Sequence, residues 1–274
     1  SNPKRVYMYV DVGGVYRSDD AGRSWRMCHG SLPANRSNYS VRGLWVDPED
    51  PDYVIIATGN RWDGRKGIYV STDGGTTWEM TYKAWFWGNG HRRAAGNVLV
   101  SDPENSNRLY IAAVDDGWAT SNDRGKTWQA NGQLKSLAPI AIWIDPNNHM
   151  NIWVSCYERK LRFEGVDRHF KRGLYFSQNQ GETFELVNTS DVHEMVQLPW
   201  ANHPLIAICE VGHLRISEDM GKTFKPLEEG LPIDEVAMKK KMSTSGSAFN
   251  ALSVGPDFVL LGARNGDIYR LNKK

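Results

Sequence analysis

The sequence predicts an all-β fold built from repeated four-stranded units, and three observations support this prediction. An eight-residue phrase, S-x-D-x-G-x-T-W in its fullest form, returns five times along the 274 residues. Short stretches of alternating apolar residues precede and follow each phrase, as strands flank the turn of a β-hairpin. An Asp-Pro pair closes an apolar stretch in three of the units. A spacing of roughly 40 to 56 residues between phrases indicates an array of one small unit.

The repeated phrase has the residues that a tight turn needs. An Asp or Asn in its third position can accept backbone N–H bonds across the turn, and the Gly that follows can adopt φ > 0 without a Cβ clash. The closing Trp or Phe is large enough to fill the gap between neighbouring sheets. We therefore interpret the phrase as a device that builds the fold, not as a catalytic motif. The five phrases cover residues 18–25, 71–78, 121–128, 177–184 and 217–224.

Alignment of the repeats predicts a unit of four antiparallel strands, named a to d. In the second unit, strand a covers residues 41–46, strand b 53–57 and strand c 67–70, and strand d begins at Trp78. The Asp-Pro pair fits the end of strand a, because proline can follow a strand end but cannot continue a central ladder. Four such strands in about 45 residues are typical of a β-propeller blade.

The two terminal units are incomplete in this prediction. Residues 1–7 align with 104–110, so the first unit lacks strand a, and residues 249–271 supply strands a, b and c of a sixth unit without strand d. We expect one domain over residues 1–274, with about 22 strands in six blades. The two partial units cannot merge into one four-stranded sheet. The chain is then either a fragment or processed product of a longer protein, or an open array capped by a partner.

The composition argues against several functions. Lys and Arg total 33 and Asp and Glu total 32, and the net charge of +1 gives no global field that favours nucleic acid or an anionic membrane. The three cysteines fit no zinc spacing, and the seven His include no pair at metal-ligand spacing. We therefore expect no metal or other cofactor. We expect no membrane span, because no run of about 20 apolar residues occurs, and no signal peptide opens the sequence, although one could have been removed.

Candidate catalytic residues lie in the connections opposite the repeated phrases. In a propeller, the d–a and b–c connections open on one face and the a–b and c–d turns on the other, so ligands should meet the b–c face. Seven residues before the phrase lie Asp11 in the first blade and Glu210 in the fifth, and Asp116 lies in the third b–c connection. Paired carboxylates, roughly 5 to 9.5 Å apart, are what glycoside hydrolysis needs. The alternative is that each is a solvated or hydrogen-bonded loop acid.

An aromatic d–a loop is the candidate for substrate contact. Residues 82–93 lie on the same predicted face and carry three large aromatics in a row. Exposed rings beside polar groups suit stacking on the C–H faces of sugars. The alternative is that at least one ring packs into the core between blades. The candidate substrate-binding residues, including two from b–c connections, are Trp62, Trp85, Phe86, Trp87, His91, Arg92, Arg93 and His213.

The five phrases resemble the Asp-box, or BNR, repeats shared by sialidases, sortilin-type receptors, photosystem assembly factors and several glycosidases. This resemblance implies a fold but no single function. A narrower resemblance lies at residues 9–17, Y-V-D-V-G-G-V-Y-R, which are similar to the Y-x-R-T-D-x-G-G-A-Y-R-W segment of family 74 glycoside hydrolases, the xyloglucanases and related endoglucanases. In that family the segment's Asp is the catalytic base, which implies this role for Asp11. Residues 93–103 resemble the family's G-R-x-M-G-E-R-L-A-V-D-P, and 116–121 its G-L-W-R-S step.

The chain also departs from the family pattern. Tyr9 and Val10 replace the family's R-T, and Asn97 and Val98 replace its E-R. The family builds its cleft between two propellers, with the acid on the second in a G-D-x-x-G-F context that this sequence lacks. The resemblance therefore implies a secreted or periplasmic, xyloglucanase-like hydrolase of β-glucan polysaccharide or oligosaccharide, or one half of its cleft with a second propeller domain or chain. The alternative is a non-catalytic glycan- or protein-binding propeller of lectin, receptor or assembly-factor type.

Overall fold

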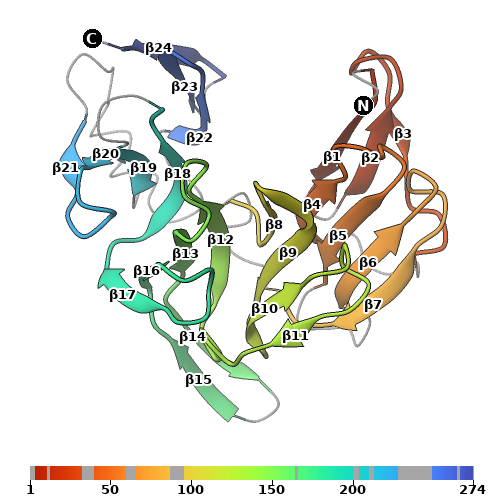
Figure 1. Cartoon of the computed structure of the whole chain (residues 1–274), viewed down its shortest axis with the longest axis horizontal. Helices are drawn as coiled ribbons and strands as arrows, with labels where there is room; N and C mark the ends of the chain where they lie inside the picture. The colour runs from red at the N-terminus through yellow and green to blue at the C-terminus, as the bar shows by residue number, and fades with distance from the viewer. Residues whose placement is uncertain are drawn as a thin grey trace.

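The computed structural model describes residues 4–10, 13–32, 40–59, 66–86, 96–163, 166–199, 204–209, 213–227, 249–263 and 266–273. Over these residues the chain forms strands and turns and no helix. Six antiparallel sheets follow one another around a common centre (Figure 1), and the first strands of consecutive sheets pack side by side. The predicted all-β propeller of six blades is confirmed.

The four middle blades are four-stranded meanders in which each strand pairs with the next along the blade. The second blade consists of β4 (Val41–Val46), β5 (Val54–Thr58), β6 (Gly67–Ser71) and β7 (Glu79–Lys83), and the third of β8 (Leu99–Asp102), β9 (Asn105–Ala113), β10 (Gly117–Ser121) and β11 (Gln129–Ala130). The fourth consists of β12 (Pro139–Ile144), β13 (Ile152–Cys156), β16 (Gly173–Ser177) and β17 (Glu185–Asn188), and the fifth of β18 (Val192–Gln197), β19 (Leu205–Cys209), β20 (His213–Ser217) and β21 (Lys225–Pro226).

The two terminal sheets have three strands each among the described residues, as expected. The register shows which strands they are, because the first residue of strand b lies opposite the serine of the repeated phrase. Val6 faces Ser18 in the first blade, as Val54 faces Ser71 in the second. The first sheet therefore contains strands b, c and d. The strands are β1 (Val6–Val10), β2 (Gly14–Ser18) and β3 (Arg26–Met27), and, in the last sheet, β22 (Phe249–Val254), β23 (Phe258–Ala263) and β24 (Ile268–Asn272).

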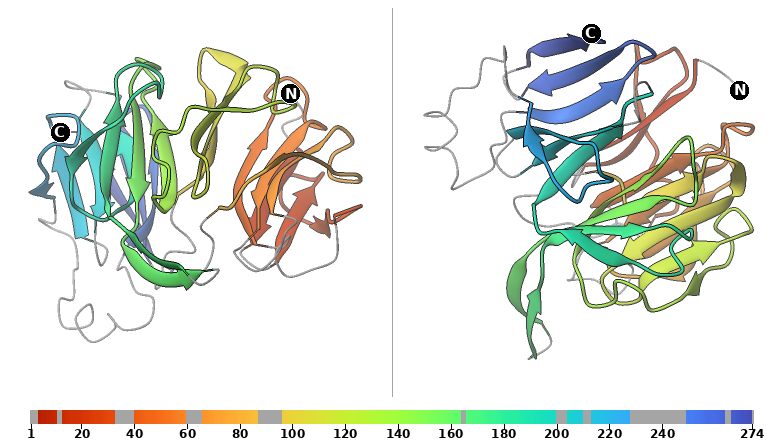
Figure 2. Two further views of the ribbon diagram at one scale, coloured as in Figure 1. Left: turned by 90° about the horizontal axis from the view of Figure 1, so that it is seen from below. Right: turned by 60° about the vertical axis from the view of Figure 1, so that its left-hand side comes forward.

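A two-stranded hairpin interrupts the fourth blade, and the sequence analysis did not predict its strands. β14 (Arg159–Phe163) pairs with β15 (Val166–Phe170) between β13 and β16. The hairpin projects from the ring in all three views (Figure 1 and Figure 2). It occupies the b–c connection, so it extends the face on which ligands were expected.

The repeated phrase forms the predicted turn. In the second blade, Ser71 Oγ accepts a 2.8 Å hydrogen bond from the N–H of Gly75, whose φ is 85°. The carboxylate of Asp73 accepts the N–H of Thr77 at 2.8 Å and its hydroxyl at 2.6 Å. The same serine, acid or amide, and threonine or serine contacts recur in the other four turns. The phrase therefore closes each c–d turn with its own side chains.

The residue before the glycine is also left-handed, which the sequence analysis did not anticipate. In the first four phrases its backbone N–H donates to a carbonyl at the a–b end of its own blade, as from Arg124 to Asn107 at 3.0 Å. The Arg124 side chain continues to the preceding blade, where it forms an ion pair with the buried carboxylate of Asp47. This turn thus joins the third blade to the second. The left-handed residues are Ala21, Gly74, Arg124, Gln180 and Met220, with φ of 62°, 68°, 63°, 55° and 61°.

The closing aromatic of each phrase packs on the preceding blade where one is present. Trp78 Nε1 donates to the carbonyl of Cys28 at 3.0 Å, and the ring of Phe184 meets Trp118 edge-on at 5.0 Å between centroids. Trp25, in the first blade, keeps 37% of its surface exposed, since no earlier blade occurs among the described residues. The prediction that these rings fill the gaps between sheets is confirmed for the later blades and wrong for Trp25.

Candidate functional site

The structure describes one of the three predicted catalytic acids, Asp116. Asp11 and Glu210 lie outside the described residues, so their roles stay predictions. Each directly follows the last residue of strand b, since β1 ends at Val10 and β19 ends at Cys209. Asp116 is described and lies at the other end of its connection, directly before β10.

Asp116 lines a polar cavity of about 540 Å³ on the b–c face. The cavity is bounded by the third b–c turn, by the connection from the third to the fourth blade, and by the inserted hairpin. Its volume falls in the range of small-ligand sites, roughly 300 to 1,000 Å³. The lining residues are Asp115, Asp116, Lys135, Ser136, His169 and Phe170.

Close backbone packing holds the two connections of this cavity together. Trp118 N–H donates to Gln133 C=O at 2.7 Å. A Cβ on Gly117, whose φ is 73°, would lie 1.9 Å from the Gln133 oxygen, so only glycine fits there. Leu134 and Ser136 have φ of 59° and 62°. Such left-handed non-glycine residues cost about 1 to 3 kcal/mol each, so the surrounding contacts hold this rim against its local backbone preference.

Asp116 is held from the neighbouring blade. Tyr82 on β7 donates its hydroxyl to Asp116 Oδ2 at 2.6 Å. Burial raises the pKa of Tyr82, and the hydrogen bond to Asp116 raises it further, so the phenol stays protonated. The Tyr82 ring packs on Trp128 at 6.2 Å between centroids. Asp116 is therefore a fixed hydrogen-bond acceptor in this cavity.

The opposite wall of the cavity comes from the hairpin, through His169 and Phe170. His169 Nε2 lies 3.1 Å from Glu158 Oε1, and both side chains are about half exposed. Phe170 beside it is buried and meets Trp85 edge-on at 6.4 Å. Together with exposed Lys135, the cavity offers carboxylate, imidazole, ammonium and hydroxyl groups. These groups can donate to and accept from the hydroxyls of a sugar.

The prediction of exposed rings is wrong for Trp85 and Phe86. Trp85 is 1% exposed and Phe86 0%, because the segment after β7 runs into the gaps between blades. Trp85 packs with Ile140 and Phe170 of the fourth blade, and Phe86 packs in the core shared by the second and third blades. The alternative that a ring packs between blades is confirmed for both. Trp62, Trp87, His91, Arg92 and Arg93 lie outside the described residues.

His213 is the only other described member of the predicted binding set. It begins β20, pairs in register with Cys209 and is partly exposed. Its position places it at the b–c end of the fifth blade, next along the chain from the connection that contains Glu210. The structure therefore puts His213 on the predicted face and Trp85 and Phe86 inside the fold.

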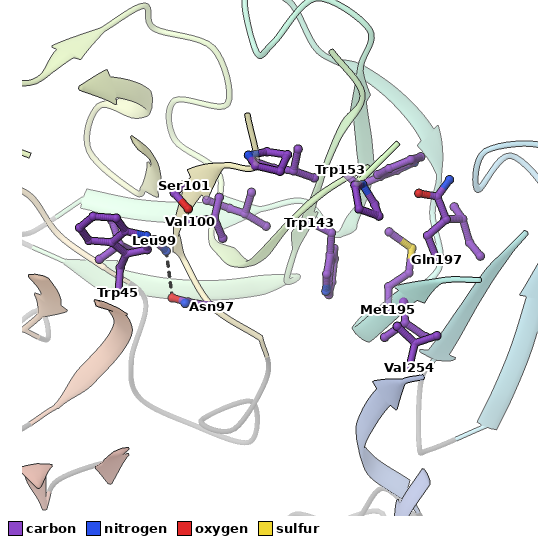
Figure 3. Close-up of a pocket in the computed structure, with 16 residues that line it drawn as sticks. Trp45, Asn97, Leu99, Val100, Ser101, Trp143, Trp153, Met195, Gln197 and Val254 are labelled. Carbon is purple, nitrogen blue, oxygen red and sulfur yellow. Dashed lines mark hydrogen bonds between the residues drawn. The ribbon is translucent and has the colours of Figure 1, made fainter. Parts of the chain in front are cut away.

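A second cavity, of about 450 Å³, lies among the inner strands at the centre of the ring (Figure 3). Trp143 on β12 donates its Nε1 to Glu194 Oε1 at 3.2 Å. Burial raises the pKa of Glu194, although hydrogen bonds from Trp143 and from the N–H of Met195 oppose the rise. This cavity was not predicted, and its signal in the sequence is a Trp two residues before the Asp-Pro pair in two of the inner strands. The walls come mainly from Trp45, Leu99, Val100, Trp143, Met195 and Val254.

Comparison with known proteins supports the resemblance. The BNR/Asp-box repeat family model matches residues 69–80. A Paenibacillus xyloglucanase is 38% identical over 130 residues, which are 45% of this chain and 13% of that enzyme. A Hypocrea jecorina xyloglucanase is 35% identical over 207 residues, 66% of this chain and 24% of the enzyme. The chain is an Asp-box β-propeller similar to the xyloglucanases of glycoside hydrolase family 74.

The fold comparison agrees with the sequence comparison. The structure of a family 74 xyloglucanase from Xanthomonas campestris superposes with a TM-score of 0.70 at 20% identity, covering 99% of this chain and 42% of that protein. The chain thus spans less than half the length of these relatives. In the described residues, no helix is long and apolar enough to cross a membrane. Within the same ranges, no group of three His, Cys, Asp or Glu side chains could hold a metal ion.

Proposed function

We propose that this chain is a glycan-directed propeller, a xyloglucanase-like glycoside hydrolase or one half of its catalytic cleft, acting on β-glucan outside the cytoplasm. The observation that carries the proposal is the 35% identity to a xyloglucanase over 207 residues, together with the match of residues 9–17 to the family segment that contains the catalytic base. A second propeller domain or chain would supply the other wall of the cleft.

In this proposal Asp11 is the general base and activates a water on one face of the scissile sugar. The acid that protonates the leaving oxygen comes from Asp116, from Glu210 or from the second propeller. An inverting reaction requires the two carboxyl groups to lie about 6.5 to 9.5 Å apart, with room for the water between them. Substrate contacts come from Trp62, Trp87, His91, Arg92, Arg93 and His213.

A second role for Asp116 follows from its contacts. The Tyr82 hydroxyl donates to its carboxylate at 2.6 Å, which fixes the carboxylate as a hydrogen-bond acceptor in the polar cavity. Carboxylate oxygens can accept further hydrogen bonds from sugar hydroxyls. If the acid is Glu210 or lies on the second propeller, Asp116 positions a sugar.

The experiment measures reducing ends released from xyloglucan and a panel of β-glucans, with glycan binding measured on the same samples. The variants are Asp11→Asn and Asp116→Asn. Activity lost in Asp11→Asn with binding retained supports a hydrolase with this base. If the unsubstituted protein binds glycan without turnover, also after addition of a second propeller, the non-catalytic alternative is supported. If it binds no glycan at all, both the hydrolase and the glycan-binding propeller are rejected.

A further inference from the structure

The cavity at the centre of the ring is lined by side chains from five different blades. Figure 3 shows the labelled side chains of β4 and β8 on one side of it and those of β12, β18 and β22 on the other. Among the described residues, sixteen line this central cavity, and none of them is Asp, Glu, Lys, Arg or His. The central cavity therefore differs in kind from the polar cavity, whose walls include Asp115, Asp116, Lys135 and His169.

A difference between the inner strands accounts for the space. Four lining residues occupy equivalent positions in successive blades, and they are Trp in the second and fourth blades but Val in the third and fifth. Each lies opposite the residue that follows the partner of the phrase's serine: Trp45 opposite Ile55, Val100 opposite Tyr110, Trp143 opposite Trp153 and Val196 opposite Ile206. Since Val is much smaller than Trp, the centre stays open beside Val100 and Val196.

The lining residues place the central cavity toward the a–b end of the inner strands. Pro103 and Pro146 belong to the Asp-Pro pairs that follow strand a, and Leu205 is the first residue of β19. The polar cavity lies on the b–c face, at the other end of the strands, where Asp116 directly precedes β10. A molecule in the central cavity therefore leaves the polar cavity free.

The walls of the central cavity offer few polar groups. The amide of Asn97 is already engaged, because its Oδ1 accepts the N–H of Leu99 at 3.0 Å and its Nδ2 donates to the carbonyl of Leu44 at 3.2 Å. The other polar side chains of the wall are partly exposed Ser101 and Gln197. A sugar has a hydroxyl on nearly every carbon, and each hydroxyl that loses water without a new hydrogen bond costs free energy. This composition disfavours sugars and ions.

One wall is a rigid indole ring in surroundings of low polarity. Trp143 donates its Nε1 to Glu194 Oε1 at 3.2 Å, which fixes the orientation of the ring. Burial raises the pKa of Glu194, although the hydrogen bonds from Trp143 and Met195 lower it, so the carboxyl beside this wall resists ionisation. Met195, which also lines the cavity, has a flexible thioether that packs well on aromatic rings. Such walls suit a planar apolar ring.

We propose that the central cavity binds an uncharged, largely apolar molecule with one or two aromatic rings and at most one or two hydroxyl groups. This site is separate from the glycan site and goes beyond the proposed hydrolase. The volume of about 450 Å³ lies in the usual range of small-ligand sites, roughly 300 to 1,000 Å³, and apolar walls with a few polar groups are their usual composition. The Ser101 hydroxyl is placed to hydrogen-bond a single polar group of the ligand.

The test uses two probes that differ in charge, neutral N-phenylnaphthylamine and its anionic counterpart anilinonaphthalene sulfonate. Val100→Trp and Val196→Trp fill the cavity with the residue that the equivalent positions already carry. Ser101→Glu adds a carboxylate to the wall without a large ring, which keeps the test decisive if a Trp variant does not fold. Met27→Trp, at a position of β3 that is 52% exposed, is the control for an added ring. Calorimetric titration measures binding, and circular dichroism checks each fold.

We expect the neutral probe to bind once per chain, with a Kd of about 1 to 100 μM, and the anionic probe to bind at least about tenfold more weakly. Folded Val100→Trp, Val196→Trp and Ser101→Glu proteins should each bind the neutral probe at least about tenfold more weakly, and Met27→Trp should bind it as the unsubstituted protein does. Binding that does not saturate, equal affinity for the two probes, or full affinity in a folded Trp variant would overturn the inference. Xyloglucan binding and hydrolysis, measured on the same proteins, should not change, so the two proposals fail independently.

Discussion

Tyr82 of the second blade donates its hydroxyl to Asp116 of the third at 2.6 Å, which fixes a carboxylate of the polar cavity from outside its own sheet. The contact links the outermost strand of one blade to the b–c turn of the next. Its loss should affect both the position of Asp116 and the cohesion of the two blades.

We expect Tyr82→Phe to lower the free energy of unfolding by about 1.5 to 3 kcal/mol, the usual contribution of a hydrogen bond to a charged group. Since the pKa of Tyr82 is raised in the fold, the stability it contributes is complete below pH 10 and is lost as the pH rises through the folded pKa. Urea unfolding at pH 7 and pH 11 measures both effects. Tyr16→Phe, a partly exposed tyrosine of β2, is the matched control; equal losses in the two variants would contradict the prediction.

The Asp-box acids predict the acid stability of the propeller. In Asp73, burial raises the pKa, but hydrogen bonds from Thr77, Ser71 and Thr76 outweigh it and lower the value to about 2. A depressed pKa stabilises the fold above the unfolded value, near pH 4, and this contribution is lost as the pH falls toward 2. Unfolding midpoints between pH 2 and 7 should therefore drop steeply below pH 4.

An Asn variant separates charge from geometry in the same turn. The fourth phrase already has Asn179, which accepts the N–H of Thr183 at 3.0 Å and donates to its hydroxyl at 2.9 Å. We expect Asp73→Asn to keep most of the stability at pH 7 and to flatten the loss in acid, while Asp73→Ala costs about 1 to 3 kcal/mol. If the Asn and Ala variants unfolded at the same denaturant concentration, the turn would depend on the charge alone.

The left-handed residue of the Asp-box turn predicts a pair of opposite substitutions. Ala21 has φ of 62° and is exposed, so Ala21→Gly relieves about 1 kcal/mol of backbone strain, less a smaller entropic loss. Gly74 occupies the same position in the second blade, and a Cβ there would lie 2.1 Å from Arg17 Nη1. Gly74→Ala should therefore destabilise the protein. Thermal unfolding of both variants checks the prediction, and a stabilised Gly74→Ala would refute it.

Trp85 should act through the fold and not through contact with sugar. The side chain is 1% exposed and packs on Phe170, so Trp85→Ala should cost about 3 to 5 kcal/mol. Trp85→Phe, which keeps an aromatic ring, should cost less and leave xyloglucan affinity unchanged. If Trp85→Phe lost xyloglucan affinity without losing stability, the prediction would be wrong and Trp85 would contact the sugar.

The fold was predictable because its signals are local and repeated. The Gly of each phrase, such as Gly75 with φ of 85°, and the proline after strand a report backbone geometry directly. The left-handed residue before that Gly carries no such signal, since Ala, Gly, Arg, Gln and Met all occupy it. In the first four phrases the N–H of this residue donates to a carbonyl at the a–b turn, a contact that belongs to the blade and not to the residue type.

The site was less predictable because it depends on contacts between blades. Three consecutive aromatics do not show whether Trp85 and Phe86 point into the core or to the surface. A large ring can pack between blades or stack on a sugar, and both environments suit it. The contact from Tyr82 to Asp116 joins residues 34 positions apart in different blades, and no local pattern encodes it. Asp11 and Glu210 lie seven residues before the phrase in their blades, and their catalytic roles are the predictions that the activity measurements test.

From the second blade on, the packing of the closing aromatic on the blade before it gives the ring a direction of assembly. Domains emerge from the ribosome with the N-terminal part first, so the surface that receives Trp78 exists before Trp78 is made. The same holds for Phe184, which meets Trp118 of the earlier blade. A nascent chain can therefore bury each new aromatic side chain against the earlier blade as soon as that side chain is made. A pause in translation between blades would then leave little apolar surface exposed.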